Sequence, residues 1–441
     1  MIGLYPWHLR SGGRRHVRPL LVAALALGGL LPSAAAVAQR FEPNYDENKV
    51  PAYTVPPIVD ESTEAAANFQ QAWQGRRAEL WQLFAEQMYG LPPSSPVQLR
   101  CEKLESGSSC GDKALRQQWR VHLSTEQGSQ TIELLVFTPT AAEKAVPCFL
   151  GLNFAGNHTV ATDEQIPVTA SWVRDTQASG AKEHQATAEG RGSSSSRWPV
   201  EQIVDAGLGV ATAYYGDIDP DFDDDFHNGV HALFPEHRPS AEHPERWGSI
   251  SAWAWGLSRL LDCLEQEVPQ VDAGRVAVLG HSRLGKTALW AGASDPRFAM
   301  VVSNDSGCGG AALSRRAVGE TVGRINTVFP HWFCPNFKQY NEREGSLPID
   351  QHQLLALVAP RLLYVASASK DRWADPQGEF LSLNLASELY QRLEDARPSA
   401  GTAAPQGAGQ PLRRVGYHLR DGQHDIDAWD WAHYIRFIQQ L

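Results

Sequence analysis

Short apolar runs alternate with helical stretches along most of the chain, and few folds accommodate this pattern. Apolar runs of this kind are typical of strands buried on both faces, as parallel strands are. Parallel strands need a long crossover between them, which the intervening helical stretches supply. The pattern therefore predicts an α/β protein with a mostly parallel central sheet flanked by helices. The predicted strands are residues 148–153, 209–213, 275–280, 300–304, 361–366 and 415–419.

The region before these strands has a different periodicity. Within residues 97–149 apolar and polar side chains alternate, as in residues 131–137, which is typical of antiparallel strands. A helix is predicted over residues 63–88, because Trp73 and Leu80 belong to a set of apolar side chains at helical spacing. We therefore expect the sheet to begin with antiparallel N-terminal edge strands.

Two stretches have the composition of surface insertions. Residues 177–196 are rich in Gly, Ser and Ala, and residues 398–411 form a low-complexity segment before the last strand. Neither stretch has the composition to bury a core. We therefore expect one domain over residues 39–441, with a mobile loop at the first insertion.

The N-terminal segment is predicted to be a secretory signal peptide. Four arginines between residues 10 and 18 precede an apolar run at residues 19–31, and Ala36-Val37-Ala38 is a small-x-small cleavage site. The apolar run is too short to cross a bilayer comfortably. We expect residues 1–38 to be removed and the mature protein to be secreted or periplasmic.

The charge balance limits the possible partners. The chain has 39 basic and 50 acidic side chains, a formal net charge of −11. Loss of residues 1–38 removes four arginines and no acid, which leaves 35 basic against 50 acidic side chains and a net charge of −15. A surface this acidic is not expected to bind nucleic acid. No later stretch is long and apolar enough for a membrane span.

Six cysteines in an exported chain permit disulfide bridges. Cys101 and Cys110 flank a Ser/Gly-rich turn, and a bridge across that predicted hairpin is one expectation; Cys308 and Cys334 form a second candidate pair. The two other cysteines lie in apolar runs and are expected to be buried free thiols. These two are Cys148 and Cys263.

Ser282 lies at a turn between a predicted strand, residues 275–280, and a predicted helix, residues 287–293. A serine at a strand-to-helix turn projects its hydroxyl above the sheet, and the helix N-terminus favours a developing oxyanion. Small residues are needed there because the turn is crowded. The usual pattern of this nucleophile elbow is G-x-S-x-G, whereas here the second glycine, Gly285, comes one residue later.

A serine nucleophile needs a base, and the base needs a carboxylate that fixes its tautomer. His424 follows the last predicted strand and is the expected base, while His418 within that strand is the weaker candidate. Two acids fit the chain order Ser, Asp, His. Asp305 follows the strand at 300–304, and Asp371 follows the strand at 361–366.

With these residues, the sequence resembles the glucuronoyl esterases, carbohydrate esterase family 15, and in particular their bacterial members. The strongest match is Gly280-His281-Ser282-Arg283-Leu284-Gly285-Lys286, which is similar to the family motif G-[CH]-S-R-x-G-K and includes the shifted glycine. The resemblance extends from about residue 44 to the C-terminus. Further matching segments are residues 303–316, 329–334, 371–376 and 424–426.

The resemblance implies an α/β-hydrolase fold and cleavage, through an acyl-enzyme, of the ester between 4-O-methyl-glucuronic acid of glucuronoxylan and a lignin alcohol. It implies that Ser282 is the nucleophile and His424 the base. It also implies that Arg283 offers its backbone N–H and its guanidinium to the oxyanion. The residues implied to hold the hydroxyls and ring of the uronate are Lys286, Glu320 and Trp373.

The resemblance and the usual order of α/β-hydrolases differ over the acid. Fungal members have a Glu where Asp305 stands, and a shorter side chain has less reach toward His424. Most α/β-hydrolases place the acid where Asp371 lies, and we favour Asp371 while keeping Asp305 as the alternative. Fungal members also bridge the neighbours of the Ser and the His with a disulfide, whereas His281 and Asp425 occupy those positions here.

Other readings stay open. The acidic run at residues 217–225 could suggest calcium, but it lacks the Gly and the closing Glu of an EF-hand loop, and a loop at the rim of the site is the preferred interpretation. No cofactor and no metal are expected. The alternatives are a different ester or amide substrate on the same triad, as in an acetyl-xylan esterase or a peptidase, and a non-catalytic carbohydrate-binding protein. The expected partners are glucuronoxylan fragments, with a monomer as the default oligomeric state.

Overall fold

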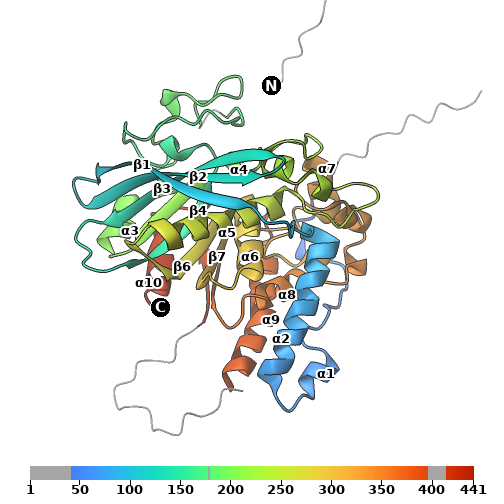
Figure 1. Ribbon diagram of the computed structural model, residues 1–441. Helices are drawn as coiled ribbons and strands as arrows, with labels where there is room; N and C mark the ends of the chain where they lie inside the picture. Colours follow the sequence, from blue (N-terminus) through green and yellow to red (C-terminus); the bar gives the residue numbers. More distant parts are fainter. Residues whose placement is uncertain (1–40, 177–178, 396–413) are drawn as a thin grey trace, which may run out of the picture. The chain divides into compact units, whose positions relative to one another are not determined.

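The structure, a computed structural model, describes residues 41–176, 179–395 and 414–441. Residues from Glu42 onward belong to one compact unit, which is built on a nine-stranded sheet (Figure 1). The spatial order of the strands is β1-β2-β3-β5-β4-β6-β7-β8-β9. The strands are β1 (Gln98–Ser109), β2 (Ala114–Thr125), β3 (Gly128–Pro139), β4 (Val146–Asn153), β5 (Gly209–Tyr214), β6 (Val271–His281), β7 (Met300–Asn304), β8 (Leu362–Ala368) and β9 (Val415–Arg420).

The sheet changes character between its two halves. Strands β1, β2 and β3 pair antiparallel, and β3 also pairs antiparallel with β5. From β5 through β4 and β6 to β9 every pair is parallel. The α/β fold with a mostly parallel sheet and antiparallel N-terminal edge strands is therefore confirmed.

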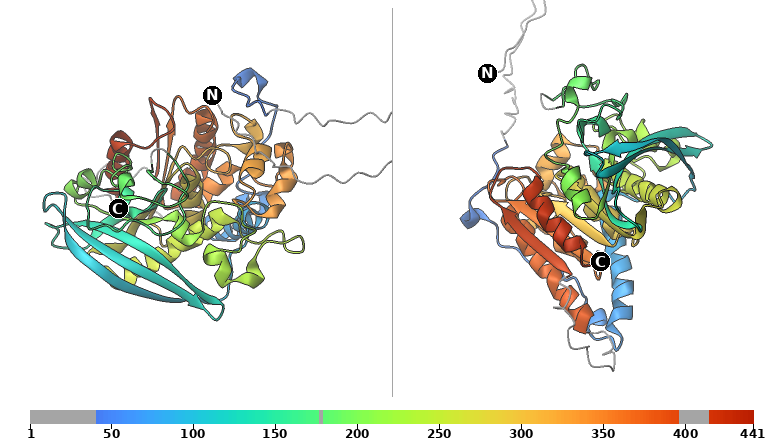
Figure 2. Two further views of the ribbon diagram at one scale, coloured as in Figure 1. Left: turned by 90° about the horizontal axis from the view of Figure 1, so that it is seen from above. Right: turned by 90° about the vertical axis from the view of Figure 1, so that its left-hand side faces the viewer.

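The helices form a layer on each face of the sheet (Figures 1 and 2). Successive residues of β6 show the two faces: Val276 and Val278 belong to one apolar core, Ala277 and Leu279 to the other. Because β6 is buried on both faces, it has the continuous apolar sequence that predicted a parallel strand. The first core includes side chains of α2 (Phe69–Phe84), α5 (Ser249–Glu267), α6 (Arg283–Ser294), α8 (Gln351–Ala356) and α9 (Pro376–Asp395), and the second those of α3 (Val200–Asp205) and α10 (Ala428–Ile438).

The predicted N-terminal helix has different bounds in the structure. The helix predicted over residues 63–88 is divided into α1 (Glu61–Glu64) and α2, because the Asn68 side chain accepts a hydrogen bond from the Gln71 N–H and starts a new helix. A π-helical turn at residues 85–89 follows, and Gly90 ends it at φ 90°. Its backbone packs so closely on Trp247 that a Cβ there would lie 2.2 Å from the Trp247 Cα.

The predicted disulfides are wrong, because all six cysteines are free thiols. Cys101 and the run up to Ser109 lie in one straight strand, β1, rather than on two arms of a hairpin, so Cys101 is roughly 30 Å along the strand from Cys110. Cys334 contacts the backbone oxygen of Glu86 at 3.7 Å, whereas Cys308 faces the Glu320 carboxylate. The second predicted pair therefore points in different directions. As predicted, Cys148 and Cys263 are buried.

Several sequence-based expectations lie outside the described residues. The signal peptide, residues 1–38, and the insertion at residues 398–411 are in this group, as are residues 177–178 of the other insertion. The rest of that insertion folds back on itself: Gly190 lies against Ser179, and Arg191 donates to the backbone oxygens of Asp163 and Ile166. Within the part of the chain that the structure describes, no helix has the length and apolarity needed to cross a bilayer.

Candidate active site

Ser282 lies between β6 and α6 in a strained backbone conformation. It adopts φ 59° and ψ −129°, a region that side chains other than Gly rarely occupy. Its N–H donates to the Asn304 oxygen at the end of β7, at 2.9 Å, so the neighbouring strand holds the turn in place. The predicted tight turn is shorter than expected, since the helix begins at Arg283 rather than at Thr287.

The two glycines of the motif are required by crowding at this turn. A Cβ on Gly280 would lie 1.8 Å from the Leu284 oxygen, which no backbone adjustment within the turn could accommodate. A Cβ on Gly285 would lie 3.0 Å from the Ser306 Cβ and 3.1 Å from the Asn304 oxygen. The shifted second glycine thus allows the first turn of α6 to pack against the end of β7.

His424 lies in the loop between β9 and α10, with its ring against the nucleophile turn. Its centroid is 4.5 Å from that of His281, the residue before Ser282. His281 is buried and donates its Nδ1–H to the Asn304 Oδ1 at 2.5 Å. Burial and the neighbouring His424 hold the pKa of His281 well below its usual value, so His281 is neutral. The His424 side chain itself is 42% exposed and accessible to a substrate.

Both candidate acids lie beside His424. Asp371 is buried, and its Oδ2 is 2.5 Å from the His424 Nδ1, which is hydrogen-bond distance. Asp305 is also buried, and a carboxylate oxygen from each acid and a ring nitrogen of His424 all lie within 4.8 Å of one another. Only Asp371 makes the direct bond that fixes the tautomer of the ring.

The surroundings of Asp305 keep its carboxyl group neutral. Burial, followed by the carboxylates of Glu379 and Asp371, raises the pKa of Asp305 to about 9. Its Oδ2 accepts the Asp425 N–H at 3.3 Å, and its Oδ1 has no hydrogen-bond partner among the described residues. A neutral carboxyl group provides no negative charge to stabilise an imidazolium, so the electrostatics also favour Asp371 as the anion of the site.

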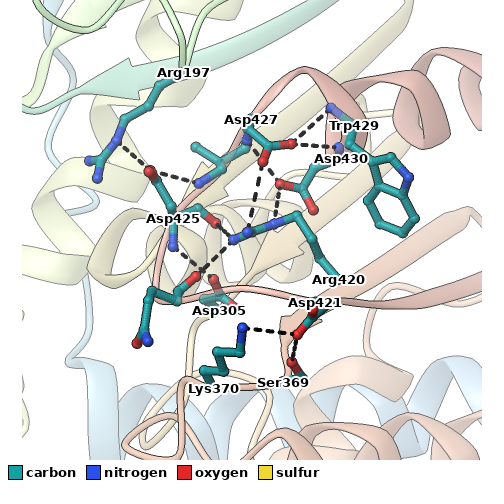
Figure 3. A network of polar contacts seen from close by, with 12 residues as sticks. Arg197, Asp305, Ser369, Lys370, Arg420, Asp421, Asp425, Asp427, Trp429 and Asp430 are labelled. Atoms are coloured by element: carbon teal, nitrogen blue, oxygen red, sulfur yellow. Dashed lines mark hydrogen bonds and ion pairs between the residues drawn. The ribbon is translucent and has the colours of Figure 1, made fainter.

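Arg420, at the end of β9, holds the loop that carries His424 (Figure 3). Its guanidinium donates to the backbone oxygens of Gln423 and Asp425, each at 2.8 Å, on either side of His424. The same guanidinium forms an ion pair with the buried Asp430 of α10 at 3.0 Å. Strand, loop and helix are therefore tied together at the position of the base.

A second ion pair fixes the residue next to the base. Asp425 is 2.7 Å from the Arg197 Nε, and Arg197 belongs to the segment just before α3 (Figure 3). His281 and Asp425 stand where the fungal members have a disulfide. In this chain a ring contact from His281 to His424 and an ion pair from Asp425 to Arg197 occupy that place.

The three residues implied to hold the uronate lie close together. Lys286, one turn into α6, is buried and donates to the Ser306 oxygen at 2.6 Å, and its Nζ is 4.0 Å from the Glu320 carboxylate. Burial lowers the pKa of Lys286 and raises that of Glu320. The Trp373 side chain forms a hydrogen bond with Glu320, and the Glu320 N–H donates to the Trp373 oxygen at 3.0 Å.

Arg283 is the first residue of α6, where a backbone N–H has no acceptor within the helix. Its side chain extends to Asp221, with which it forms a close ion pair. The sequence did not single out Asp221. It was one of several acids in the run at residues 217–225, and composition marks the run as unusual without showing which carboxylate faces the site.

That acidic run does not gather around a common point. Asp217 accepts the Ser171 hydroxyl at 2.5 Å, Asp219 is 3.1 Å from the His231 Nδ1, and Asp221 binds Arg283. Among the described residues, Asp305, Asp371 and His424 are the acids and histidines whose ligand atoms come close enough to share an ion. The run thus divides between three separate networks.

His418 lies away from the nucleophile turn. Its ring is buried, with Nε2 at 2.8 Å from the Asp430 Oδ1 and Nδ1 at 3.1 Å from the Tyr364 hydroxyl. It belongs to the network behind Arg420. His418 therefore supports the base loop through Asp430, and His424 is the histidine that lies against the nucleophile turn.

Sequence comparisons find related proteins over nearly the whole chain. A family model described as "Glucuronyl esterase, fungi" matches residues 241–394. A relative named "Carbohydrate esterase MZ0003", from an unknown prokaryotic organism, is 46% identical over 395 residues, which cover 89% of this chain and 91% of that protein. A 4-O-methyl-glucuronoyl methylesterase of Podospora anserina is 36% identical over 155 residues, 33% of this chain and 32% of that protein.

Solved structures resemble the chain as closely. A promiscuous CE15 esterase from a marine bacterial metagenome superimposes with a TM-score of 0.80 at 44% identity, over 90% of this chain and 99% of the other. A glucuronoyl esterase from Solibacter usitatus gives a TM-score of 0.77 at 40% identity, over 89% and 99% of the two chains.

Proposed function

Because the chain belongs to carbohydrate esterase family 15, the glucuronoyl esterases, and is a carboxylic-ester hydrolase of that type, we propose that it cleaves esters of 4-O-methyl-glucuronic acid through an acyl-enzyme on Ser282. The observation that carries this mechanism is the pair formed by the His424 Nδ1 and the Asp371 Oδ2, 2.5 Å apart, beside the nucleophile turn.

In the first step His424 removes the hydroxyl proton of Ser282 through Nε2, and Oγ attacks the ester carbonyl carbon. Asp371 holds the Nδ1 proton and stabilises the imidazolium that forms. The imidazolium then protonates the leaving alkoxide, and the alcohol departs. A water molecule, deprotonated by His424, attacks the acyl-enzyme and releases the uronic acid together with free Ser282.

The negative charge that develops on the carbonyl oxygen needs fixed donors. Arg283 is the first residue of α6, so its backbone N–H lies at the positive end of the helix dipole. The guanidinium of the same residue is a second, cationic donor. Donors that are already in place stabilise the transition state more than the ester ground state. We therefore assign the oxyanion to Arg283.

The uronate itself is assigned to Lys286, Glu320 and Trp373. A buried ammonium and a buried carboxyl group offer both donors and acceptors to ring hydroxyls, and an indole offers a flat face to the ring. An acetyl ester has no ring hydroxyls and gains none of these contacts. The arrangement therefore favours uronate over acetate.

The natural alcohol is assigned to lignin and the acid to glucuronoxylan, on the resemblance to the family. Broader ester hydrolysis is the second candidate, because a relative of known structure at 44% identity is described as a promiscuous CE15 esterase.

The proposal that the protein is exported rests on the N-terminal residues 1–38. N-terminal sequencing of protein recovered outside the cytoplasm would test it: a start near Gln39 is expected, and a chain that retains Met1 would contradict export.

The test compares hydrolysis of benzyl glucuronate, methyl galacturonate and an acetyl ester by the wild type and by Ser282→Ala. We expect a clear preference for the glucuronate and a loss of kcat by about four to six orders of magnitude in the variant, because the triad acts as a unit. Circular dichroism would check that the variant folds. Equal rates on all three esters would favour the second candidate, and a variant within tenfold of wild type would refute Ser282 as the nucleophile.

A further inference from the structure

Asp221 is a fully buried carboxylate that accepts hydrogen bonds from five side chains. They come from separate parts of the chain: the loop between the 3-10 turns at residues 157–159 and 188–190, α4 (Tyr215–Ile218), α6, and the segment after α7 (Val322–Val328). Such a concentration of donors on one carboxylate is unusual for a surface loop. The donors are Arg174 (3.1 Å), Tyr215 (3.0 Å), Arg283, His331 (3.0 Å) and Trp332 (2.8 Å).

The guanidinium of Arg283 is fixed from a second direction by aromatic rings. Its central carbon lies 4.7 Å from the ring centroid of Trp332, 5.4 Å from that of Phe329 and 5.9 Å from that of Phe154. The Trp332 and Phe329 rings are themselves stacked at 3.7 Å. Asp221 holds the edge of the guanidinium while the rings cover its faces, so both its position and its plane are set.

Arg283 keeps donors for a ligand after this bond is made. Asp221 takes the Nη1 group, and the Nε–H is buried with no hydrogen-bond partner among the described residues. The side chain is 20% exposed, which leaves part of it accessible from solvent. A guanidinium presents five N–H donors in one plane, so a bond on one edge orients the others.

We propose that Asp221 is a positioning residue for the oxyanion: it holds the Arg283 guanidinium at the place where negative charge develops on the ester. This inference rests on the proposed role of Arg283. An arginine on a long flexible side chain would otherwise lose conformational entropy in each transition state. A buried anion that is already bonded to it removes that loss before the substrate arrives.

Asp221 also supplies a constant charge. Although burial by itself would raise it, the pKa of Asp221 lies well below the usual range because of the hydrogen bond from His331 and the charge of Arg283. The groups packed around it are Arg174, Arg283 and His331 together with two neutral donors. The carboxylate is therefore ionised at neutral pH.

Asp217 provides a matched control on the same segment. It is buried to the same degree, and its carboxylate accepts the Ser171 hydroxyl at 2.5 Å and the Glu133 N–H at 3.2 Å. None of these partners contacts Arg283 in the part of the chain that the structure describes. Asp217→Asn therefore changes a buried carboxylate on the same segment without touching the proposed oxyanion donor.

The experiment measures kcat and KM on benzyl glucuronate, and the melting temperature, for Asp221→Asn, Asp217→Asn, Arg283→Ala and the double variant Asp221→Asn/Arg283→Ala. We expect Asp221→Asn to lower kcat by roughly ten- to a hundredfold with little change in KM, since one misplaced oxyanion donor costs a fraction of its removal. Asp217→Asn should keep kcat within about threefold. In the Arg283→Ala background, Asp221→Asn should have no further effect, because a positioning residue has nothing left to position.

Two outcomes separate this inference from the proposed function. A full loss of kcat in Arg283→Ala with no change in Asp221→Asn would overturn only the inference, whereas an unchanged kcat in Arg283→Ala would overturn the role of Arg283 as well. An equal effect of Asp221→Asn with and without Arg283 would show a purely structural role and overturn the inference.

If Asp221→Asn does not fold, Tyr215→Phe removes one donor from the same carboxylate oxygen that binds Arg283. The same proposal then predicts a smaller loss of kcat, roughly two- to tenfold, that disappears in the Arg283→Ala background. A loss that persists there would overturn the proposal.

Discussion

The backbone of Ser282 is strained, and contacts with the neighbouring strand and helix hold it in this conformation. Its φ of 59° is unfavourable for a side chain with a Cβ and costs about 1–3 kcal/mol. The hydrogen bond to Asn304 and the close packing of Gly280 on Leu284 hold the turn regardless. The strain has a purpose, because this conformation is the one that lifts Oγ above the end of the sheet.

The identity of the acid can be tested at the same scale. Asp371→Asn should lower kcat by about 10⁴, because the amide favours the wrong tautomer of His424. Asp305→Asn should change kcat by less than about tenfold, since the carboxyl of Asp305 is already neutral at pH 7 and an amide replaces it with little change of charge. Both variants and their double would be measured on a soluble uronate ester.

The double variant distinguishes independent from redundant acids. If only Asp371 serves the base, the double variant resembles Asp371→Asn. If each single change is mild and the double change severe, either carboxylate can orient His424. Full activity in Asp371→Asn beside a collapse in Asp305→Asn would place the acid at the fungal position instead.

At the scale of the element, the loop between β9 and α10 depends on Arg420. Replacement by Met keeps an unbranched apolar stem but removes the guanidinium, and with it the bonds to the Gln423 and Asp425 oxygens and the ion pair with Asp430. We expect kcat to fall by roughly ten- to a hundredfold, because His424 would no longer be held at its working distance. The uncompensated Asp430 should also lower the melting temperature by several degrees.

Arg197→Gln is the matched comparison on the opposite side of the loop. The pair that Arg197 forms with Asp425 is partly exposed, at 35% and 47% of the two side chains, and such pairs contribute about 0–1 kcal/mol. We expect kcat within about threefold of wild type. Equal losses in both variants would argue against a special role for Arg420.

The two glycines of the nucleophile elbow differ in how much space they leave. Gly280→Ala should prevent soluble expression or abolish activity, since its Cβ would lie 1.8 Å from a backbone oxygen. Gly285→Ala meets its neighbours at 3.0 Å and beyond, so we expect a folded protein with a melting temperature lower by a few degrees. Circular dichroism and thermal denaturation would compare the two, and a stable, active Gly280→Ala protein would contradict the geometry of the turn.

For the whole molecule, the important feature is that three carboxyl groups meet at the end of one sheet. Asp305, Glu379 and Asp371 lie near one another at the ends of β7 and β8, and burial raises the pKa of Glu379 to about 7 and that of Asp305 to about 9. Glu379 accepts the N–H groups of Ser306 and Gly307, which fixes the segment after β7. Because these carboxyl groups are buried at this end of the sheet, the free energy of unfolding of the domain is expected to depend on pH.

The sign of that dependence follows from proton binding. Asp305 has a pKa of about 9 when folded and about 3.9 when unfolded, so the folded state binds more protons over the whole interval. Stability from this group is therefore lost as pH rises toward 9, on the order of 1.4 kcal/mol per pH unit. Glu379, whose pKa is about 7, also loses its proton in the lower part of the range from pH 7 to pH 9, so the contribution of Asp305 is isolated by comparison with Asp305→Asn.

Thermal denaturation at pH 7, 8 and 9 would measure it. We expect the melting temperature of the wild type to fall by a few degrees over this range, and that of Asp305→Asn to fall clearly less, because an amide has no proton to lose. Parallel curves for the two proteins would mean that Asp305 is ionised in the folded state.

The sequence by itself determined the fold class, the nucleophile turn and the family. Strand and helix patterns are local. A strand buried on both faces is apolar at nearly every residue, and a strand buried on one face alternates apolar and polar residues. The G-x-S-x-x-G spacing is local too, because the crowding at Gly280 and Gly285 arises within one turn and its nearest strand. These features are therefore readable before any tertiary contact is known.

The tertiary structure alone decided which distant side chains meet. The choice between Asp371 and Asp305 depended on how two loops, at the ends of β8 and β7, approach a third loop after β9. The disulfides failed for the same reason, since Cys101 and Cys110 are near in sequence but lie far apart on one extended strand. Asp221 could not be distinguished from its acidic neighbours, because its role comes from five donors that chain folding brings from elsewhere. Hydrogen bonds and ion pairs act over a few ångströms, and sequence separation does not determine which groups come within that range.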